Sequence, residues 1–146
     1  GALEPLTLLR RPDDALVPGV RVFTVNTARA VRQMLQMAVE PGGTGTQARA
    51  VGYSVGGKTG TARKQAAGGY ESKKYRAWFV GMAPVDRPRV VVAVMIDEPS
   101  DSIYGGTVAA PVFRDVVQQA LRIRGIQPDL VVEPAIVASS TGEEPS

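Results

Sequence analysis

No cysteine and no histidine occur among the 146 residues of the chain, and only 5% of its residues are aromatic. Without cysteine the chain forms neither a disulfide bond nor a thiol nucleophile. Without histidine it lacks the commonest general base and the commonest metal ligand. The scarcity of aromatic residues argues against a protein that binds nucleic acid by stacking on its bases. Any chemistry must therefore come from Lys, Ser, Thr, Tyr, Asp or Glu, and we expect no cofactor.

The chain also lacks a long hydrophobic run, because no apolar stretch approaches the roughly 18 residues that cross a bilayer. It has no signal peptide and begins with Gly1 rather than Met, so we expect it to be a piece of a longer protein. What is present is a hydrophobic fraction of 44%, which is enough to build a core. The length suits one domain or part of one.

Positive charge is unevenly distributed along the chain. The net charge is +3, but every Lys and Arg lies before residue 125, while four acidic residues lie after it. Between residues 58 and 76 a single acidic residue, Glu71, accompanies six basic ones: Lys58, Arg63, Lys64, Lys73, Lys74 and Arg76. This local excess would attract an anion, although Lys73 and Lys74 are also explained by a solvated loop.

The pattern of apolar residues predicts a helix, three strands and a second helix. The first helix is expected to begin after Thr24 and to run to about Val39, because Ala28, Val31, Leu35 and Ala38 recur at helical spacing. Strands are expected at 54–64, 75–84 and 89–97, and the short turn at 84–88 makes the last two an antiparallel hairpin. The second helix is expected from about Ala109 to Arg124, with a proline in its first turn.

These elements predict an α+β fold, in which helices flank an antiparallel sheet. The run of β-branched residues in 90–94 predicts that the third strand is covered on both faces. Residues 1–24 are expected to be extended with one short strand, and loops are expected at 68–74 and 98–106. We place the domain at residues 1–125 and interpret residues 126–146, rich in Pro, Ser, Thr and Glu, as a mobile tail.

The densest group of reactive side chains is Val55–Lys64, which reads V-G-G-K-T-G-T-A-R-K. Side chains alternate along a strand, so Thr59 and Thr61 share one side and can both donate to one carboxylate. Gly60 has no Cβ and lets a ligand lie against the backbone, while Lys58 supplies a positive charge. If the outer edge of this strand is unpaired, it can bind an extended peptide as an added strand. The segment therefore predicts a site for a peptide that ends in a carboxylate.

A lone K-T-G tripeptide is common and usually has no function, so its surroundings matter. Gly52–Lys64 resembles the third motif of the penicillin-binding proteins and related serine β-lactamases, whose signature is K-T-G. The resemblance covers most of residues 1–125 and is carried by Gly1–Leu9, Ala38–Gly45, Tyr75–Pro84, Met95–Pro99 and Tyr104–Phe113. The order and spacing of these stretches are similar to class B enzymes, and within them to the septal, cell-division type of Gram-negative bacteria.

The resemblance implies a peptidoglycan D,D-transpeptidase. In this family a serine attacks the D-Ala-D-Ala bond of a stem peptide, forms an acyl-enzyme and passes the acyl group to an amine on a neighbouring strand. β-Lactam antibiotics acylate the same serine. The resemblance also implies that the three predicted strands belong to a larger, five-stranded sheet of the penicillin-binding protein and serine β-lactamase type.

The resemblance also assigns roles to residues of this chain. Lys58 supports the electrostatics and the proton relay, and the N–H of Thr61 is half of the oxyanion hole. The residues that would contact substrate or drug are Thr59, Gly60, Thr61, Arg63, Tyr75 and Tyr104. Among these, the two threonines bind the carboxylate, Arg63 adjusts that contact, and the two tyrosines form part of an aromatic wall.

Two motifs of the family are missing from this chain. No serine has a lysine three residues after it, and none has an asparagine two residues after it, so neither S-x-x-K nor S-x-N occurs. Because both precede K-T-G in the family, we interpret the chain as the C-terminal part of a transpeptidase domain. We expect it to be inactive alone, to expose a large apolar face, and to need the N-terminal part of that domain as its partner. The complete protein is expected on the periplasmic side of the inner membrane, among divisome proteins, with its anchor outside this chain.

Three other interpretations remain open at this point. A non-catalytic peptide-binding or assembly module would use the strand edge and the basic segment only to dock a partner. A serine β-lactamase fragment would carry the same K-T-G. A nucleic-acid binder fits the isoelectric point of about 9.5, but the few aromatic residues and the lack of a basic helix oppose it, and we expect no nucleic-acid partner.

Overall fold

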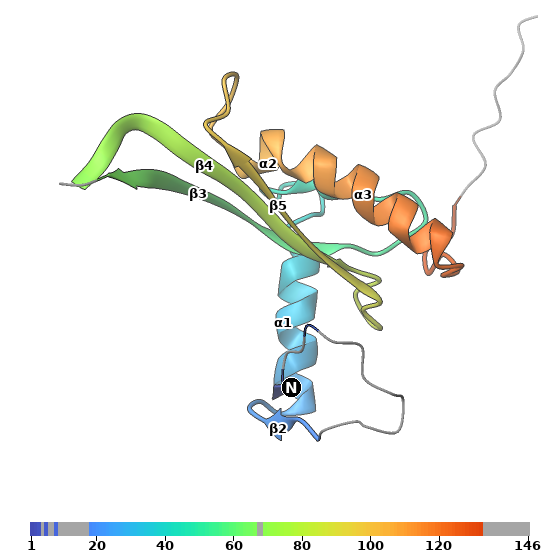
Figure 1. The fold of residues 1–146 in the computed structure, drawn as a ribbon. Helices are drawn as coiled ribbons and strands as arrows, with labels where there is room; N and C mark the ends of the chain where they lie inside the picture. The colour runs from blue at the N-terminus through green and yellow to red at the C-terminus, as the bar shows by residue number, and fades with distance from the viewer. Residues whose placement is uncertain (4, 6–7, 9–17, 67–68, 133–146) are drawn as a thin grey trace, which may run out of the picture.

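A computed structural model describes residues 1–3, 5, 8, 18–66 and 69–132 of the chain. Its centre is an antiparallel sheet in the order β3–β4–β5, formed by β3 (Gly56–Ala66), β4 (Gly69–Ala83) and β5 (Val90–Asp97) (Figure 1). The prediction of three antiparallel strands, the last two in a hairpin, is confirmed. In the part of the chain that the structure describes, β3 and β5 are the two edges of this sheet.

The helix α3 (Ala110–Ile123) lies across one face of the sheet (Figure 1). Phe113, Val117 and Leu121 recur at helical spacing and are completely buried. The ring of Phe113 packs against that of Phe79 on β4, with 4.7 Å between the ring centroids. The predicted second helix is therefore confirmed, including the proline in its first turn. Its end follows from Gly125, which has a φ of +64° that glycine adopts without strain.

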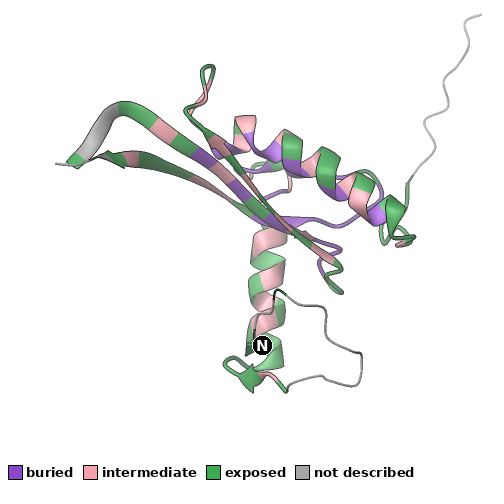
Figure 2. Cartoon of the chain, viewed as in Figure 1, coloured by how far each residue is buried: buried purple, intermediate pink, exposed green. Residues whose placement is uncertain are grey.

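The helix α1 (Val25–Met37) projects away from the opposite side of the sheet (Figure 1). It begins at the predicted cap, because the Thr27 amide donates to the Thr24 hydroxyl at 3.1 Å. Its last turn lies close to the start of β3, where a Cβ added at Gly56 would come within 3.3 Å of the Gln36 nitrogen. None of its residues is buried (Figure 2), and Met34 is 65% exposed. On the predicted apolar side Val31 is 47% exposed, whereas Ala28, Leu35 and Ala38 are half-buried, so the described residues cover this side only in part.

One face of β5 is covered and the other is not. Burial alternates along the strand, and Val90, Val92, Val94 and Ile96 pack against the core on the α3 side. On the opposite face Val91 is 69% and Met95 is 44% exposed. The prediction that this strand is covered on both faces is wrong for this chain, because the described residues supply a layer on one face only.

Two predicted loops are shorter than expected. The strand β4 begins at Gly69, so residues 70–74 belong to a strand and not to a loop, while residues 67–68 lie outside the described residues. The predicted loop at 98–106 ends early, because the short helix α2 (Gly105–Val108) begins at the glycine pair. In both places the glycines were interpreted as breaks in regular structure. Instead, Gly69 begins the strand β4, and Gly105 and Gly106 begin the helix α2.

The remaining short elements lie before β3. Instead of one short strand, residues 1–24 contain β1 (Ala2–Leu3) and β2 (Val20–Arg21), which pair antiparallel. A single turn of 3-10 helix, η1 (Thr46–Ala48), lies between α1 and β3. None of the helices in the described ranges is both long and apolar enough to span a bilayer.

Residues 126–132 differ from the predicted mobile tail because hydrogen bonds hold them to the body of the chain. The Ser54 amide donates to Asp129 at 2.9 Å, and the Ser54 hydroxyl donates to the other oxygen of the same carboxylate. That hydroxyl also accepts from the Val85 amide at 2.8 Å, and the Tyr53 hydroxyl donates to the Ile126 carbonyl at 2.7 Å. Residues 133–146 lie outside the described residues, so the rest of that prediction is untested.

Candidate ligand-binding site on the edge strand

The four residues Lys58–Thr61, here called the KTGT segment, lie in the middle of β3. They pair with β4 on one side, with Lys58 opposite Val80 and Thr61 opposite Ala77. The other side of β3 has no strand partner among the described residues. An antiparallel edge of this kind presents backbone N–H and C=O groups to a further strand. The segment is therefore placed where an extended peptide can pair with it.

The KTGT segment presents different chemistry on its two faces. Thr59 is opposite Phe79 and Thr61 is opposite Ala77, and both of these β4 residues are buried. Because cross-strand partners point to the same face, the two threonines lie on the α3 side of the sheet, and Lys58 lies on the other. Thr59 is half-buried, whereas Lys58 and Thr61 are exposed. The cation and the two hydroxyls can meet one ligand only at the strand edge.

Both threonine hydroxyls already have partners within the chain. The Thr61 hydroxyl donates to the Ile103 carbonyl at 3.2 Å, and the Thr59 hydroxyl is 3.2 Å from that of Thr44, where either can be the donor. Each hydroxyl has one proton, so Thr61 has to turn its proton from Ile103 towards a carboxylate in order to bind it. Thr59 keeps its proton for a ligand when Thr44 is the donor.

The glycines Gly105 and Gly106 bring α2 against the KTGT segment. A Cβ added at Gly105 would lie 2.0 Å from the Trp78 carbonyl oxygen and 2.9 Å from that of Gly60. One added at Gly106 would lie 2.1 Å from the Thr44 oxygen. Contacts this short exclude any side chain at either position. The backbone of α2 therefore packs directly beside the two threonines.

Gly57 and Gly60, both in β3, are glycines for different reasons. A Cβ at Gly57 would be 2.5 Å from the ring of Phe79, so core packing requires glycine there. A Cβ at Gly60 would meet only the Cβ of Trp78, at an ordinary contact distance of 3.4 Å, and the backbone has no positive φ at that residue. Packing within the described chain does not account for Gly60, which fits the prediction that a ligand approaches the backbone there.

The Lys58 ammonium group remains close to the strand. Its Nζ donates to the carbonyl oxygen of Thr59 at 3.0 Å. This contact turns the side chain back along β3 and keeps the charge within one residue of the threonines. It is a single hydrogen bond on an exposed residue, so a ligand anion can replace it at small cost.

The other three predicted contact residues are dispersed. Arg63 and Tyr75 are cross-strand partners, and the Arg63 guanidinium lies 5.9 Å from the centre of the Tyr75 ring. Tyr104 is 65% exposed and immediately precedes α2. Among the described residues, the one close ring pair joins Phe79 and Phe113. The aromatic wall of Tyr75 and Tyr104 therefore remains a prediction.

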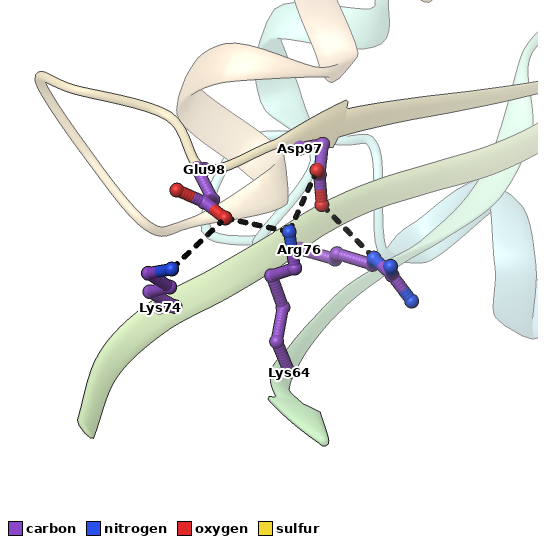
Figure 3. Close-up of polar contacts among 5 residues, drawn as sticks. All are labelled: Lys64, Lys74, Arg76, Asp97 and Glu98. Atoms are coloured by element: carbon purple, nitrogen blue, oxygen red, sulfur yellow. Dashed lines mark hydrogen bonds and ion pairs between the residues drawn. The ribbon is translucent and has the colours of Figure 1, made fainter. Parts of the chain in front are cut away.

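Five charged residues gather beyond the KTGT segment and form the cluster shown in Figure 3, here called the Lys64 cluster: Lys64, Lys74, Arg76, Asp97 and Glu98. Lys64 reaches from β3 to the end of β5, and its Nζ lies 2.9 Å from Asp97 and 2.6 Å from Glu98 (Figure 3). Arg76 binds Asp97 at 2.9 Å, and Lys74 lies 3.8 Å from Glu98. The cluster joins the end of β3 to the first residue after β5.

The contacts of Lys64 shift three pKa values in the direction that favours charge. Hydrogen bonds to Glu98 and then Asp97 raise the pKa of Lys64. The bond from Lys64 lowers the pKa of Asp97 and of Glu98, with Arg76 adding to the shift at Asp97. The carboxylates are partly exposed, so water and salt screen these effects.

The lowered carboxyl pKa values predict that the start of the 98–104 loop opens in acid. Their contribution to stability is present above the pKa of the unfolded chain and is lost as the pH falls through the pKa of the folded protein, so the loss is expected below about pH 4. The contribution of Lys64 to stability depends on pH in the opposite direction: it is lost only as the pH rises through the raised pKa of Lys64. The probe is the Glu98 amide, which donates to the Tyr75 carbonyl at 2.9 Å.

The measurement is hydrogen exchange of peptides that span residues 95–104, corrected for the intrinsic effect of pH. Protection is expected to fall with acid in the parent protein and to be low at all pH values in Lys64→Met. Equal acid sensitivity in the parent and the variant would show that Lys64 does not hold this segment.

Several residues that build this site were not predicted from the sequence. Thr44, Ile103, Gly105 and Gly106 contact the KTGT segment from three other parts of the chain. The glycine pairs at 42–43 and 105–106 could have indicated such close contacts, but they were interpreted only as breaks between elements. The partners of Lys64 lie 33 and 34 residues away and carry no local signal.

Comparison with known proteins places most of the chain in one family. A family profile described as "Penicillin binding protein transpeptidase domain" matches residues 4–118. The chain is 45% identical over 139 residues to a probable peptidoglycan D,D-transpeptidase PenA of Neisseria gonorrhoeae, and 39% identical over 130 residues to the peptidoglycan D,D-transpeptidase FtsI of Escherichia coli K12. These alignments cover 94% and 88% of this chain. They cover 23% and 22% of the relatives, so the chain spans less than a quarter of their length.

Solved structures show the same fold. The transpeptidase domain of Burkholderia pseudomallei penicillin-binding protein 3 matches with a TM-score of 0.80 and 48% identity, over 90% of this chain and 40% of that one. A peptidoglycan glycosyltransferase from Burkholderia ambifaria matches with a TM-score of 0.78 and 42% identity, over 90% and 38%. The predicted α+β fold, with helices flanking an antiparallel sheet, is therefore confirmed.

Proposed function

The chain belongs to the penicillin-binding protein transpeptidase family, and from this we propose that it is the C-terminal part of a peptidoglycan D,D-transpeptidase domain. The complete domain joins stem peptides through a serine acyl-enzyme, and β-lactams acylate the same serine. The observation that carries this proposal is the accessible KTGT segment on an edge strand, in a chain related to named D,D-transpeptidases over most of its length.

In this function the chain supplies the surface against which the substrate lies. The stem peptide, which ends in D-Ala-D-Ala, pairs with the open edge of β3. Its carboxylate accepts hydrogen bonds from Thr59 and Thr61, and Gly60 leaves room for its backbone. The positive charge of Lys58 attracts the carboxylate and eases proton movement at the nucleophile. The N–H of Thr61 donates to the oxyanion that develops when the serine attacks.

The more distant residues have smaller roles in this proposal. Arg63, two residues beyond Thr61 on the same side of β3, adjusts the position of the carboxylate. Tyr75 and Tyr104 contact the apolar part of the ligand. These assignments rest on two observations. Arg63 lies on β3 over the Tyr75 ring, and the Tyr104 side chain is exposed just before α2.

The nucleophile belongs to a part of the protein outside this chain. Neither S-x-x-K nor S-x-N occurs here. Exposed apolar side chains on α1 and on the open face of β5, among them Met34, Val91 and Met95, mark where the N-terminal part of the domain would pack. By the same proposal the complete enzyme works on the periplasmic side of the inner membrane, with the divisome, in the synthesis of septal peptidoglycan.

Labelling with a fluorescent penicillin tests this division of roles. The chain alone is expected to carry no label after a denaturing gel, because it has no serine with a lysine three residues after it to form the acyl-enzyme. The complete protein is expected to be labelled on a serine outside this chain. A labelled band from this chain alone would contradict the proposed division.

Turnover distinguishes the proposal from the nearest alternatives. A transpeptidase keeps the label and releases it slowly, whereas a β-lactamase hydrolyses the drug repeatedly. A non-catalytic peptide-binding module would leave the complete protein unlabelled.

A further inference from the structure

We propose that Lys64 is a positioning residue for ligand binding, because it holds the first residue of the 98–104 loop whose other end contacts Thr61. This inference rests on the function proposed above and adds to it a residue that has no contact with the ligand. Lys64 is three residues beyond Thr61 on β3, and its side chain is only 17% exposed. It points away from the ligand edge and towards the end of β5 (Figure 3).

The first end of the loop depends on Lys64 for its position. Glu98 follows β5 directly and has a φ of +49°, a conformation that non-glycine residues rarely adopt. Three contacts hold it there: its amide donates to the Tyr75 carbonyl at 2.9 Å, its carboxylate accepts from Lys64 at 2.6 Å, and Lys74 lies 3.8 Å from the same carboxylate. Lys64 also binds Asp97, and so neutralises two adjacent acids that would otherwise repel each other.

The second end of the loop lies against the KTGT segment. The Ile103 carbonyl accepts the proton of Thr61 at 3.2 Å, so this end of the loop lies against the side chain that is proposed to bind the ligand. The hydroxyl then reaches a ligand carboxylate by turning its proton about the Cβ–Oγ bond, with no movement of heavy atoms. Tyr104 and the close approach of Gly105 to the Gly60 oxygen follow immediately. The same strand therefore holds both ends of the loop, through Lys64 and through Thr61.

Loss of the Lys64 contact would leave the first end of this loop held only by the Glu98 amide and by the longer contact with Lys74, and so would loosen it. Ile103 would leave Thr61 for part of the time, and Tyr104 would take several positions beside the site. Because Tyr104 is proposed to contact the ligand, a ligand would then have to order the loop as it binds, and this cost appears as weaker binding. The serine and its base belong to other parts of the protein, and Lys58 and the Thr61 N–H stay in place on β3, so the acylation step itself would not change.

The test measures acylation of the complete protein by a penicillin, with the dissociation constant of the first complex separated from the acylation rate constant at saturation. Lys64→Met is expected to raise the dissociation constant about tenfold and to leave the rate constant within about twofold. Lys64→Arg can still bind both carboxylates and is expected to restore binding. Glu98→Gln removes the charge from one of the two Lys64 contacts and is expected to weaken binding less than Lys64→Met does, and to add little in the double variant, because Lys64→Met has already removed that contact.

Arg114→Met is the matched control, because it removes a cation from an exposed 2.7 Å ion pair on α3. Binding is expected to be unchanged in this variant. The proposal is overturned if Lys64→Met binds penicillin as the parent does, if Arg114→Met weakens binding equally, or if Lys64→Met lowers only the rate constant.

Thr61→Val separates failure of this proposal from failure of the proposed function. If Thr61→Val loses binding and Lys64→Met does not, the loop contact is irrelevant and the site stands. If Thr61→Val also binds normally, the carboxylate site is wrong, and the role of Lys64 falls with it.

Discussion

Replacing Lys58 by methionine is expected to slow acylation of the complete protein by a penicillin at least about 100-fold at neutral pH. Methionine keeps the length of the side chain and removes its charge. The Lys58 Nζ lies 3.0 Å from the Thr59 carbonyl and so stays beside the two threonines that are proposed to hold the ligand carboxylate. Its loss removes the positive charge beside the two threonines. The second-order rate constant for labelling by a fluorescent penicillin measures the effect.

Lys73→Met is the control for this prediction. Lys73 is exposed and lies in the same basic segment, so its replacement lowers the net charge by the same amount. If the attraction of the ligand depended only on the overall positive charge of residues 58–76, the two variants would lose similar amounts of activity. A loss confined to Lys58→Met identifies a local role, whereas equal losses would contradict it.

Two glycine-to-alanine changes in β3 are expected to have opposite results. Gly60→Ala is expected to leave the melting temperature unchanged or slightly raised, because its Cβ meets only Trp78 at 3.4 Å and alanine is less costly than glycine in a strand. Penicillin labelling of this variant is expected to fall at least about tenfold, because the new methyl group occupies the space that the ligand backbone needs. Melting and labelling are both measured on the complete protein.

Gly57→Ala is the matched variant three residues earlier. Its Cβ would lie 2.5 Å from the Phe79 ring and 2.9 Å from the Val80 oxygen, so it is expected to destabilise the fold by about 1–3 kcal/mol through overpacking. If Gly60→Ala were labelled at the parent rate, no ligand would lie against this part of the strand. If it unfolded as Gly57→Ala does, glycine at 60 would be explained by packing after all.

Most of the elements could be predicted because their signals are local. Thr24 caps α1 with its own hydroxyl, and the spacing of Phe113, Val117 and Leu121 gives the buried side of α3. The KTGT segment was found in the same way, since alternation on one strand is enough to place Thr59 and Thr61 on one face. Each of these conclusions needs only a few consecutive residues.

The features that could not be predicted depend on residues distant in sequence. The hydroxyl of Thr61 faces a carbonyl 42 residues later, and Lys64 binds two acids more than 30 residues away. Composition cannot show such pairs. The prediction that β5 is covered on both faces was wrong for a related reason. A run of β-branched residues indicates that a strand is suited to burial, but not which layers of the protein are present to cover it.

The hydrogen bonds between Asp129 and Ser54 limit how far the chain can be shortened at its C-terminal end. A fragment that stops at residue 125, where the change in composition invites the cut, would remove the acceptor for both the amide and the hydroxyl of a buried serine. Each donor left unpaired costs about 1–3 kcal/mol, a large share of the stability of a small domain. A soluble and crystallisable version of this protein should therefore extend at least to residue 132.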